Sequence, residues 1–275
     1  MDHWHFGMRY GGDDLYPRCK RTGHQYNVWA TVKTMRIPWK YAALLFVVSF
    51  ALMSSLGIKV SNADGLVAKN DPIALYGKEI LFDVFRENER VGSHTVRFHR
   101  DGDELIVNSR FELKIDVLFF TVYRFLYQSN SIWRGPLINN LNVEVDDNGE
   151  VFRLSADRNG NEMSILSSAG TAEIKGRVFP TNHWNSNVVH EQRVLNTLTG
   201  RINNVRIEAH ERERVPTERG EIEATRYAYT GDLQTEVWYD DMGRWVKMRF
   251  AGRDGTRIDY VCQRCQGPRT ESVAK

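Results

Sequence analysis

Cysteine, excess charge and catalytic motifs are all scarce in this chain of 275 residues. Its three cysteines are too few for a scaffold held together by several disulfides. The net charge of +2 arises near the N-terminus, because residues 1–63 hold 8 Lys and Arg against 3 acids. The 29 basic and 32 acidic residues that follow give a net charge of −3. A domain with this balance lacks the basic surface that binds nucleic acid, so we expect no nucleic-acid partner.

Catalytic and cofactor signatures are missing as well. The sequence has no G-x-S-x-G motif, and no glycine-rich phosphate loop precedes a predicted helix. His190-Glu191 begins like the zinc-protease motif H-E-x-x-H, but Val194 stands where the second histidine is required. We therefore expect a protein that is not an enzyme, with no catalytic residue, no cofactor and no bound metal.

One long apolar run is present, YAALLFVVSFALMSSLGI at residues 41–58, and it contains no charged residue. Arg36 and Lys40 precede it, which is the basic flank of an exported segment. As a membrane anchor the run would be short, since a span needs about 20 residues. The positive-inside rule then places its N-terminal side in the cytoplasm and residues 64–275 outside.

The residues around this run also fit a cleaved secretory signal. Met35 begins the basic stretch MRIPWK, and Ser61 and Ala63 are small residues at the spacing that a signal peptidase recognises. We expect translation to start at Met35, with residues 1–34 a non-native extension, residues 35–63 the signal and cleavage after Ala63. The alternative is an uncleaved anchor that contacts the membrane through residues 41–58. Both interpretations predict a periplasmic or otherwise exported domain, cleaved or anchored in the inner membrane.

The exported part has the period-2 hydrophobicity of antiparallel strands. In residues 105–117 the apolar side chains alternate with Asn108, Arg110, Glu112, Lys114 and Asp116. Such alternation predicts a sheet with one buried and one wet face. We expect a linker at 64–77, an antiparallel β domain at 78–262 and a flexible tail at 263–275.

Further strands are predicted between turn-forming residues rich in Asn, Asp and Gly. They span residues 80–86, 91–99, 141–146, 151–156, 172–178, 205–212, 222–229, 235–239, 245–250 and 258–262. Residues 185–198 predict one short helix that ends at Gly200. The predicted fold is all-β and mainly antiparallel, a strongly curved sheet or open half-barrel with one short helix after the N-terminal hydrophobic helix.

Several motifs in order resemble a known family. They are ILFDVFRENERVGSHTVRFHRDGDELIV at 80–107, TVYRFLYQSNSIWRGPL at 121–137, FPTNHWN at 179–185, LNTLTGRI at 195–202 and VWYDDMGRWVKMRF at 237–250. They resemble an exported, uncharacterised alphaproteobacterial family, the domain of unknown function numbered six-one-three-four. The resemblance implies an antiparallel β architecture and an envelope location, and it implies no activity. More loosely, the pattern is similar to the half-barrels of LolA-like lipoprotein carriers, and this second likeness concerns the fold alone.

Aromatic side chains on predicted strands and on the FPTNHWN stretch are the candidates for ligand binding. A half-barrel has one apolar face that serves both as its core and as its pocket, so these residues fit either role. The candidate ligand-binding residues are Tyr123, Phe125, Tyr127, Trp133, His183, Trp184 and Trp238.

Cys262-Gln263-Arg264-Cys265 is a C-x-x-C sequence. One such pair is two ligands short of a tetrahedral zinc site. No βαβ pattern surrounds it, as a thioredoxin-like site would require. In an oxidising compartment the pair is predicted to form a short structural disulfide, or to remain as inert thiols.

The sequence favours a non-enzymatic envelope protein that binds an apolar or amphipathic molecule, or a lipidated partner, on a concave sheet. We expect its partner to be a lipid or a lipoprotein. The alternative is a structural or assembly factor of the envelope that acts through protein contacts. An enzyme built around His183 is the third and least favoured hypothesis.

Overall fold

The computed structural model describes residues 71–267. The predicted N-terminal extension, the signal or anchor at 35–63 and the cleavage site at Ala63 lie outside the described residues. Within residues 71–267, no helix has the length and apolar character needed to cross a membrane. These residues form the β domain that the sequence predicts.

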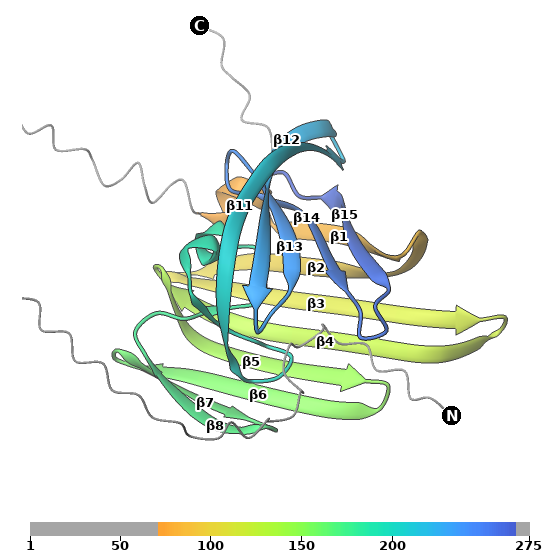
Figure 1. Ribbon diagram of the computed structural model, residues 1–275. Coiled ribbons are helices and arrows are strands. Elements are labelled where there is room, and N and C mark those ends of the chain that lie inside the picture. The colour runs from red at the N-terminus through yellow and green to blue at the C-terminus, as the bar shows by residue number, and fades with distance from the viewer. Residues whose placement is uncertain (1–70, 268–275) are drawn as a thin grey trace, which may run out of the picture. The chain divides into compact units, whose positions relative to one another are not determined.

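Fifteen strands form one sheet in the described residues (Figure 1). The strands are β1 (Glu79–Arg86), β2 (Glu89–Asp101), β3 (Glu104–Val117), β4 (Phe120–Arg134), β5 (Leu137–Asp147), β6 (Glu150–Asn159), β7 (Glu162–Ser167), β8 (Gly170–Lys175), β9 (Phe179–Pro180), β10 (Arg193–Leu195), β11 (Ile202–Thr217), β12 (Gly220–Gly231), β13 (Thr235–Asp240), β14 (Trp245–Ala251) and β15 (Arg257–Arg264). The strands pair in the order β8-β7-β6-β5-β4-β3-β2-β1-β15-β14-β13-β12-β11-β10-β9. All pairs are antiparallel except β9 with β10.

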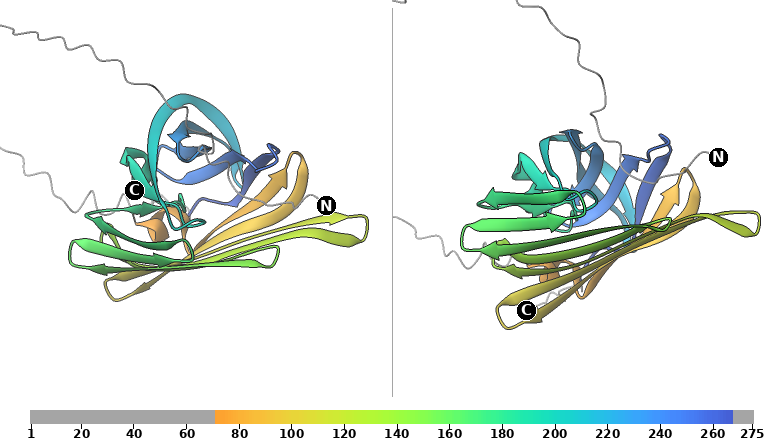
Figure 2. Two further views of the ribbon diagram at one scale, coloured as in Figure 1. Left: turned by 60° about the horizontal axis from the view of Figure 1, so that its bottom comes forward. Right: turned by 90° about the horizontal axis from the view of Figure 1, so that it is seen from below.

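This order forces the sheet to curve. β8 and β9 lie at opposite ends of the sheet, yet residues 176–178 alone separate them along the chain. Four steps along a chain reach at most about 14 Å, so the two ends of the sheet must come near each other. Figure 2 shows β9–β15 rising from one end of the sheet and lying over one face of β2–β8. The all-β, mainly antiparallel and strongly curved fold is confirmed.

The core fills the concave side of this sheet, and the alternation in the sequence explains why. In β3 the inward positions Leu105, Val107, Ser109, Phe111 and Leu113 are buried, whereas the residues that alternate with them point to the other face. Trp133, Trp245 and Tyr123 are among the largest fully buried side chains. Burying side chains of this size supplies most of the free energy that holds such a sheet together.

The helix predicted at 185–198 is wrong in extent and in type. The structure has a 3₁₀ turn, η2 (Ser186–His190), followed by the short strand β10. Asn185 caps the turn, because its Oδ1 accepts a hydrogen bond from the Asn187 amide at 3.1 Å. Val194 and Leu195 are buried between neighbouring strands rather than along a helical stripe.

Ordered structure also extends beyond the boundaries that we expected for the β domain. The predicted linker contains the helix α2 (Pro72–Tyr76), which Asp71 caps and whose Tyr76 is buried. The tail expected from residue 263 onward includes Cys265 and Gln266, which are both buried. The Gly267 amide then donates a hydrogen bond of 2.7 Å to the carbonyl of Leu75 in α2. The strand β7 was not predicted at all.

Candidate functional site

A small cavity lies between the concave face of the sheet and residues 181–198. The cavity has a volume of about 60 Å³, which is room for about four water molecules. β2, β3, β4, β14 and β15 supply its walls. The lining residues are His94, Phe111, Phe125, Tyr127, Thr181, Asn182, His183, Asn196, Thr197, Leu198, Trp245, Met248, Phe250 and Tyr260.

Hydrogen bonds fasten residues 181–198 over this cavity. The Thr181 amide donates to the Leu195 carbonyl at 3.1 Å, and the Thr197 amide donates to Thr181 Oγ1 at 3.3 Å. Tyr127 on β4 donates its hydroxyl to Thr197 Oγ1 at 3.2 Å. The hydroxyl groups of Thr181, Thr197 and Tyr127 therefore bond within one network, and the rest of the lining is mainly aromatic and aliphatic.

The ring of His183 is polar and buried without a partner, and Nδ2 of the neighbouring Asn182 is likewise buried and unbonded in the described residues. The side chain is 3% exposed, and neither ring nitrogen has a hydrogen-bond partner among the described residues. The ring packs edge-on against Tyr229 at 5.5 Å and lies 5.9 Å from Trp245. Burial lowers the pKa of His183 to about 4, so the imidazole is neutral at neutral pH.

The backbone of His183 is held in an unusual conformation. Its φ of +40° lies in the left-handed region, which costs a non-glycine residue of order 1 kcal/mol or more. The hydroxyl of Tyr239 donates a hydrogen bond of 2.8 Å to the His183 carbonyl. Next to it, Tyr76 donates to the Trp184 carbonyl at 2.9 Å and accepts from the Trp245 amide at 2.8 Å. Two buried tyrosines thus fix this strained segment against the sheet.

His94 on β2 is the second buried imidazole. Its Nε2 lies 2.7 Å from Ser109 Oγ, and its Nδ1 has no partner in the described part of the chain. Burial first, and then the neighbouring His183, lower the pKa of His94 to about 3. His94 was not predicted from the sequence, although His94 points to the same face of β2 as the buried Val96 and Phe98. That shared position in the alternation is the signal that would have placed it inside.

The Ser109–His94 contact does not amount to a catalytic site. A nucleophilic serine needs a histidine that accepts a proton and a carboxylate that orients it. No carboxylate bonds Nδ1 of His94 in the described residues, and burial strongly disfavours the imidazolium that the reaction would form. What the cavity offers is an apolar space with a neutral hydrogen-bonding ring in its wall. This suits an uncharged apolar group.

The structure brings three of the seven predicted ligand-binding residues together around the cavity, namely Phe125, Tyr127 and His183. Trp133 and Trp184 stack edge-to-face with ring centroids 5.2 Å apart, and neither lines the cavity. These two rings belong to the packed core.

The other two predicted residues are also away from the cavity. Tyr123 donates its hydroxyl to Asp147 Oδ1 at 2.6 Å. Trp238 lies beneath Lys247, whose Nζ is 4.1 Å from the centre of the indole ring, and beneath Arg249. Both aromatic rings are therefore used in packing and in polar contacts with their neighbours on the sheet.

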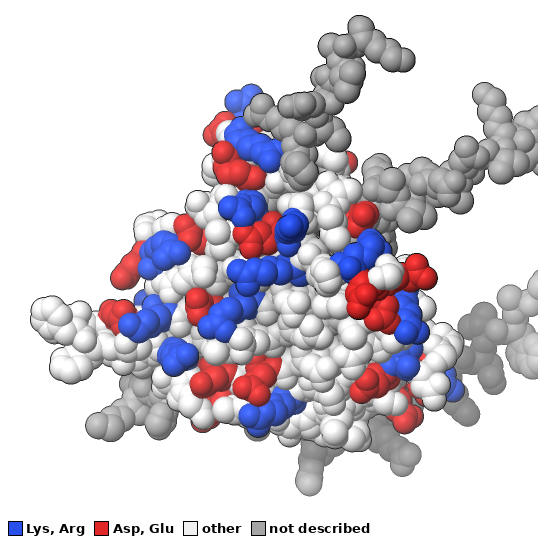
Figure 3. Space-filling view, turned by 180° about the vertical axis from the view of Figure 1, so that it is seen from behind, with Lys and Arg blue, Asp and Glu red and all other residues white. Residues whose placement is uncertain are grey.

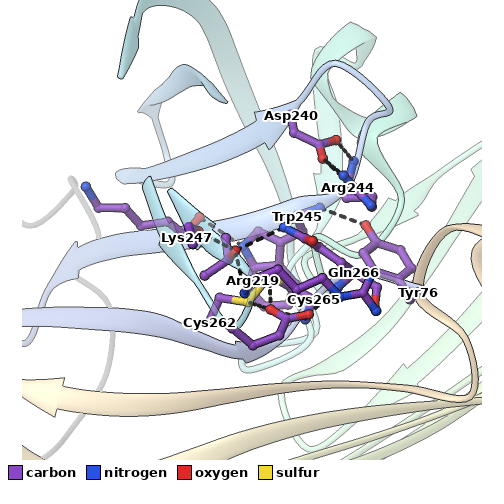
Figure 4. Close-up of a disulfide and its surroundings, with 12 residues drawn as sticks. Tyr76, Arg219, Asp240, Arg244, Trp245, Lys247, Cys262, Cys265 and Gln266 are labelled. Atoms are coloured by element: carbon purple, nitrogen blue, oxygen red, sulfur yellow. Dashed lines mark hydrogen bonds and ion pairs between the residues drawn. A yellow bond between two sulfur atoms is a disulfide. The ribbon is translucent and has the colours of Figure 1, made fainter. Parts of the chain in front are cut away.

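Cys262 and Cys265 are joined by a disulfide bond at the end of β15, with their Cα atoms 5.9 Å apart (Figure 4). Glu218, in the turn between β11 and β12, accepts hydrogen bonds from the Cys265 amide at 3.3 Å and the Gln266 amide at 3.1 Å. Arg219 donates to the Gln266 carbonyl at 3.4 Å. The disulfide thus fixes the chain just after β15. There the backbone of Cys265 and Gln266 hydrogen-bonds to Glu218 and Arg219 of the β11–β12 hairpin.

Glu218 is also the third member of a possible ligand group. One carboxylate oxygen of Glu218 and the sulfurs of Cys262 and Cys265 all lie within 4.8 Å of one another. A metal binds cysteine as the thiolate, and sulfurs joined in a disulfide do not provide one. The oxidised pair is therefore a structural link, and the Glu218 oxygen 3.0 Å from Cys262 Sγ makes a contact there rather than a hydrogen bond.

A second hollow, of about 940 Å³, lies across β2–β7 and is lined largely by polar side chains. Its amides bond one another, as in the 2.8 Å hydrogen bond from Asn130 Nδ2 to Asn108 Oδ1. On the face shown in Figure 3, Lys and Arg side chains are interleaved with Asp and Glu. This hollow is open, and Ser129 Oγ is the one atom of its lining that is buried without a hydrogen-bond partner in the described residues. The more enclosed cavity, with both ring nitrogens of His183 unpartnered, is the better candidate site.

Comparison with known proteins places the domain in a family. No curated protein matches the sequence. Among solved structures, the β-barrel-like protein of the domain of unknown function DUF1849 from Brucella abortus is similar, at 11% identity and a TM-score of 0.50, covering 70% of this chain and 97% of that one. At this identity the likeness shows the fold alone. The family described as domain of unknown function (DUF6134) matches residues 82–263, well over half of the chain. The resemblance stated from the motifs is thereby confirmed, and the chain belongs to the DUF6134 family.

Proposed function

We propose that this domain is a non-enzymatic binding protein of the cell envelope, which takes the apolar end of an amphipathic molecule or lipidated partner into the cavity beside His183. The observation that carries the proposal is the ring of His183, which is buried next to an open space and has no partner for either nitrogen in the described residues. A buried polar group without a hydrogen bond costs about 1–3 kcal/mol. A ligand or its water that bonds this ring recovers that cost.

The size of the cavity sets what fits. Pockets for drug-sized ligands have roughly 300–1,000 Å³, several times the 60 Å³ here. A few methylene groups fit without rearrangement, so the resting domain admits a chain end rather than a whole acyl chain. A deeper ligand requires residues 181–198 to move, and the strain at His183 makes this segment the one that gains from moving.

The cavity wall carries no charge, and this determines which part of a ligand can enter. The lining contains no Lys, Arg, Asp or Glu, and both histidines are neutral at neutral pH. A carboxylate or phosphate therefore gains nothing by entering, whereas each buried methylene gains about 0.8 kcal/mol. The charged head of an amphipathic ligand is expected to stay outside, near Thr181 and Leu198 at the partly exposed edge.

The envelope location in this proposal rests on the apolar run at 41–58 and its flanks, which predict export. N-terminal sequencing of the native protein tests it. A mature N-terminus near Asp64, in protein recovered from the periplasm or the membrane, supports export. Protein recovered intact from the cytoplasm contradicts it.

Binding is tested with the delipidated full chain and a polyene fatty acid whose fluorescence rises in an apolar site. We expect saturable binding, weakened at least about tenfold in Leu198→Trp, because the larger side chain fills the cavity mouth. Leu166→Trp is the matched control, since Leu166 is exposed and lies outside the cavity. Absence of binding by the unmodified protein, or equal affinity in both variants, refutes the proposal.

The alternative, an assembly factor, draws support from the edge strand β8, which has β7 as its one neighbour in the sheet. An exposed edge can pair with a strand of another protein. Purification of the native protein distinguishes the two: a stoichiometric protein partner together with no fatty-acid binding favours the assembly role.

A further inference from the structure

The turn between β3 and β4 carries an exposed apolar cluster, separate from the cavity. Leu118 is 87% exposed, Phe119 97% and Phe120 73%, and Val117 and Val122 beside them are about half exposed. Thr121 is the one polar residue in this stretch of six. We call residues 117–122 the β3–β4 tip. Exposing such large apolar side chains to water is unfavourable, and exposed apolar clusters of this kind mark sites of interaction with a protein or a membrane.

Other turns of the same sheet have a different composition, so the apolar residues at the tip are not required to form a turn. They use Asp101-Gly102, Asn148-Gly149, Asn159-Gly160 and Asp254-Gly255, the small polar residues that tight turns favour. At the β3–β4 tip, Leu118 instead takes a φ of +56°, a conformation that Asn or Gly adopts at much lower cost. The tip is thus more strained and more apolar than these four turns. Folding alone does not explain it.

The shape of the hairpin presents the tip to a partner. β3 and β4 are 14 and 15 residues long, and their far end projects beyond the rest of the sheet (Figure 1). In Figure 3 this end forms an uncharged projection at the left edge. Within the hairpin the backbone groups of Val117 and Phe120 face each other in the ladder. A paired hairpin end can therefore enter an apolar medium with few backbone groups left unbonded.

Basic residues lie at the base of this projection. Lys114 and Arg124 are opposite each other across the two strands. The nearby carboxylate of Asp116 already bonds Lys114 at 3.3 Å and accepts a hydrogen bond from Thr121 at 2.7 Å. This arrangement matches a membrane surface, where anionic headgroups overlie the acyl chains. The apolar tip would lie among the acyl chains, and the two cations would lie at the level of the headgroups.

We propose that the β3–β4 tip inserts into the surface of a lipid bilayer that contains anionic phospholipids. Six residues on a narrow projection are far fewer than the roughly 20–30 per side that a stable protein interface uses, whereas they suffice for a lipid anchor. From the level of Lys114 to Phe119 the strands extend about 17 Å, enough to pass the headgroups while the body of the domain stays outside. The inference does not depend on the cavity or on what it binds.

The test places an environment-sensitive fluorophore on the tip, so that it reports on this site whatever other segments do. The full chain carries Cys19→Ser and Phe120→Cys, and the fluorophore is attached to the new thiol, because Cys262 and Cys265 are joined to each other. Vesicles contain phosphatidylethanolamine and phosphatidylglycerol in a three-to-one ratio. We expect a blue shift and an increase in emission of about threefold or more as the probe leaves water.

Two variants serve as controls. The same probe at Asn161→Cys, in the β6–β7 turn at the opposite end of the sheet, should show no change. Leu118→Asn with Phe119→Gly restores ordinary turn residues, so the fold should be at least as stable while the vesicle response of the Phe120 probe is lost. Thermal unfolding verifies the stability of this variant.

Three outcomes overturn the inference. The first is a Phe120 probe that stays in water with vesicles present, and the second is an equal response from the Asn161 probe. The third is a blue shift in buffer that grows with protein concentration, since that would identify a second copy of the chain as the partner. An equal response to vesicles of phosphatidylcholine alone would remove the role assigned to Lys114 and Arg124.

Discussion

The two buried histidines predict that acid destabilises this domain well above the pH at which carboxylates are protonated. The pKa of His94 falls from an ordinary 6.5 to about 3, and that of His183 from 6.5 to about 4. Between these values the unfolded chain binds protons that the folded chain does not. The contribution of the two histidines to the free energy of unfolding is therefore greatest above pH 6.5 and falls as the pH is lowered.

The magnitude follows from the linkage relation. At pH 5 an unfolded imidazole lies 1.5 pH units below its pKa, and each unit is worth about 1.4 kcal/mol. His94 and His183 then each remove about 2 kcal/mol relative to neutral pH, or about 4 kcal/mol together. Against a typical total stability of about 5–15 kcal/mol this loss is large.

Urea unfolding at pH 7, 6 and 5 measures the effect. His183→Asn tolerates the positive φ, and His94→Phe keeps an aromatic ring, so both variants should fold. Each should remove about half of the loss between pH 7 and 5, whatever its stability at pH 7. His99→Gln is the control, because His99 is exposed and should leave the pH dependence unchanged. A wild-type stability that is flat from pH 7 to 5, or an equal loss in all variants, would refute the reasoning.

Two further predictions concern the disulfide and the close approach of β2 to β3 at Gly92. Replacing Cys262 and Cys265 by Ser should cost about 2 kcal/mol in urea unfolding, the entropy of closing a four-residue loop, and dithiothreitol should lower the stability of the wild type by the same amount without affecting the variant. Gly92→Ala should destabilise the protein by about 3 kcal/mol or more, because its Cβ would lie 2.0 Å from the Glu112 carbonyl oxygen and the backbone must shift to admit it. Gly102→Ala is the matched control for thermal unfolding: its Cβ meets open space, so only the strain of its φ, about 1–2 kcal/mol, is expected. Equal losses in both glycine variants would show that the close approach at Gly92 is unimportant.

Strands were predictable from the sequence where one face of the sheet is wet. β3 alternates apolar and polar residues over its whole length, and the prediction of 105–117 falls within its observed bounds. The segment around Val194 and Leu195 is buried on all sides and short, so its apolar residues fit a helix or a strand equally well. Its structure is decided by pairing with β9 and β11, which are distant signals that a local pattern does not contain.

The candidate site was predictable only in part, for a related reason. Phe125 and Tyr127 follow a clear alternation and were correctly placed on the inner face. Trp238 lies in a run of three buried residues, because β11 packs against β14 and β15 on the far side of the sheet and covers that face too. Where both faces are covered, alternation no longer tells inside from outside, and Trp238 was assigned to the wrong side.

The seam between β1 and β15 governs how this domain can be assembled. These strands come from the two ends of the domain, with Val84 opposite Tyr260, yet they pair in the middle of the sheet. As the chain emerges in order from its N-terminus, β1 keeps one bare edge until the last strand arrives, and such long-range pairing is slow. Losing β8 would only move an outer edge inward by one strand. Losing β15 would instead split the sheet in two, with β1 and β14 both left as open templates for aggregation.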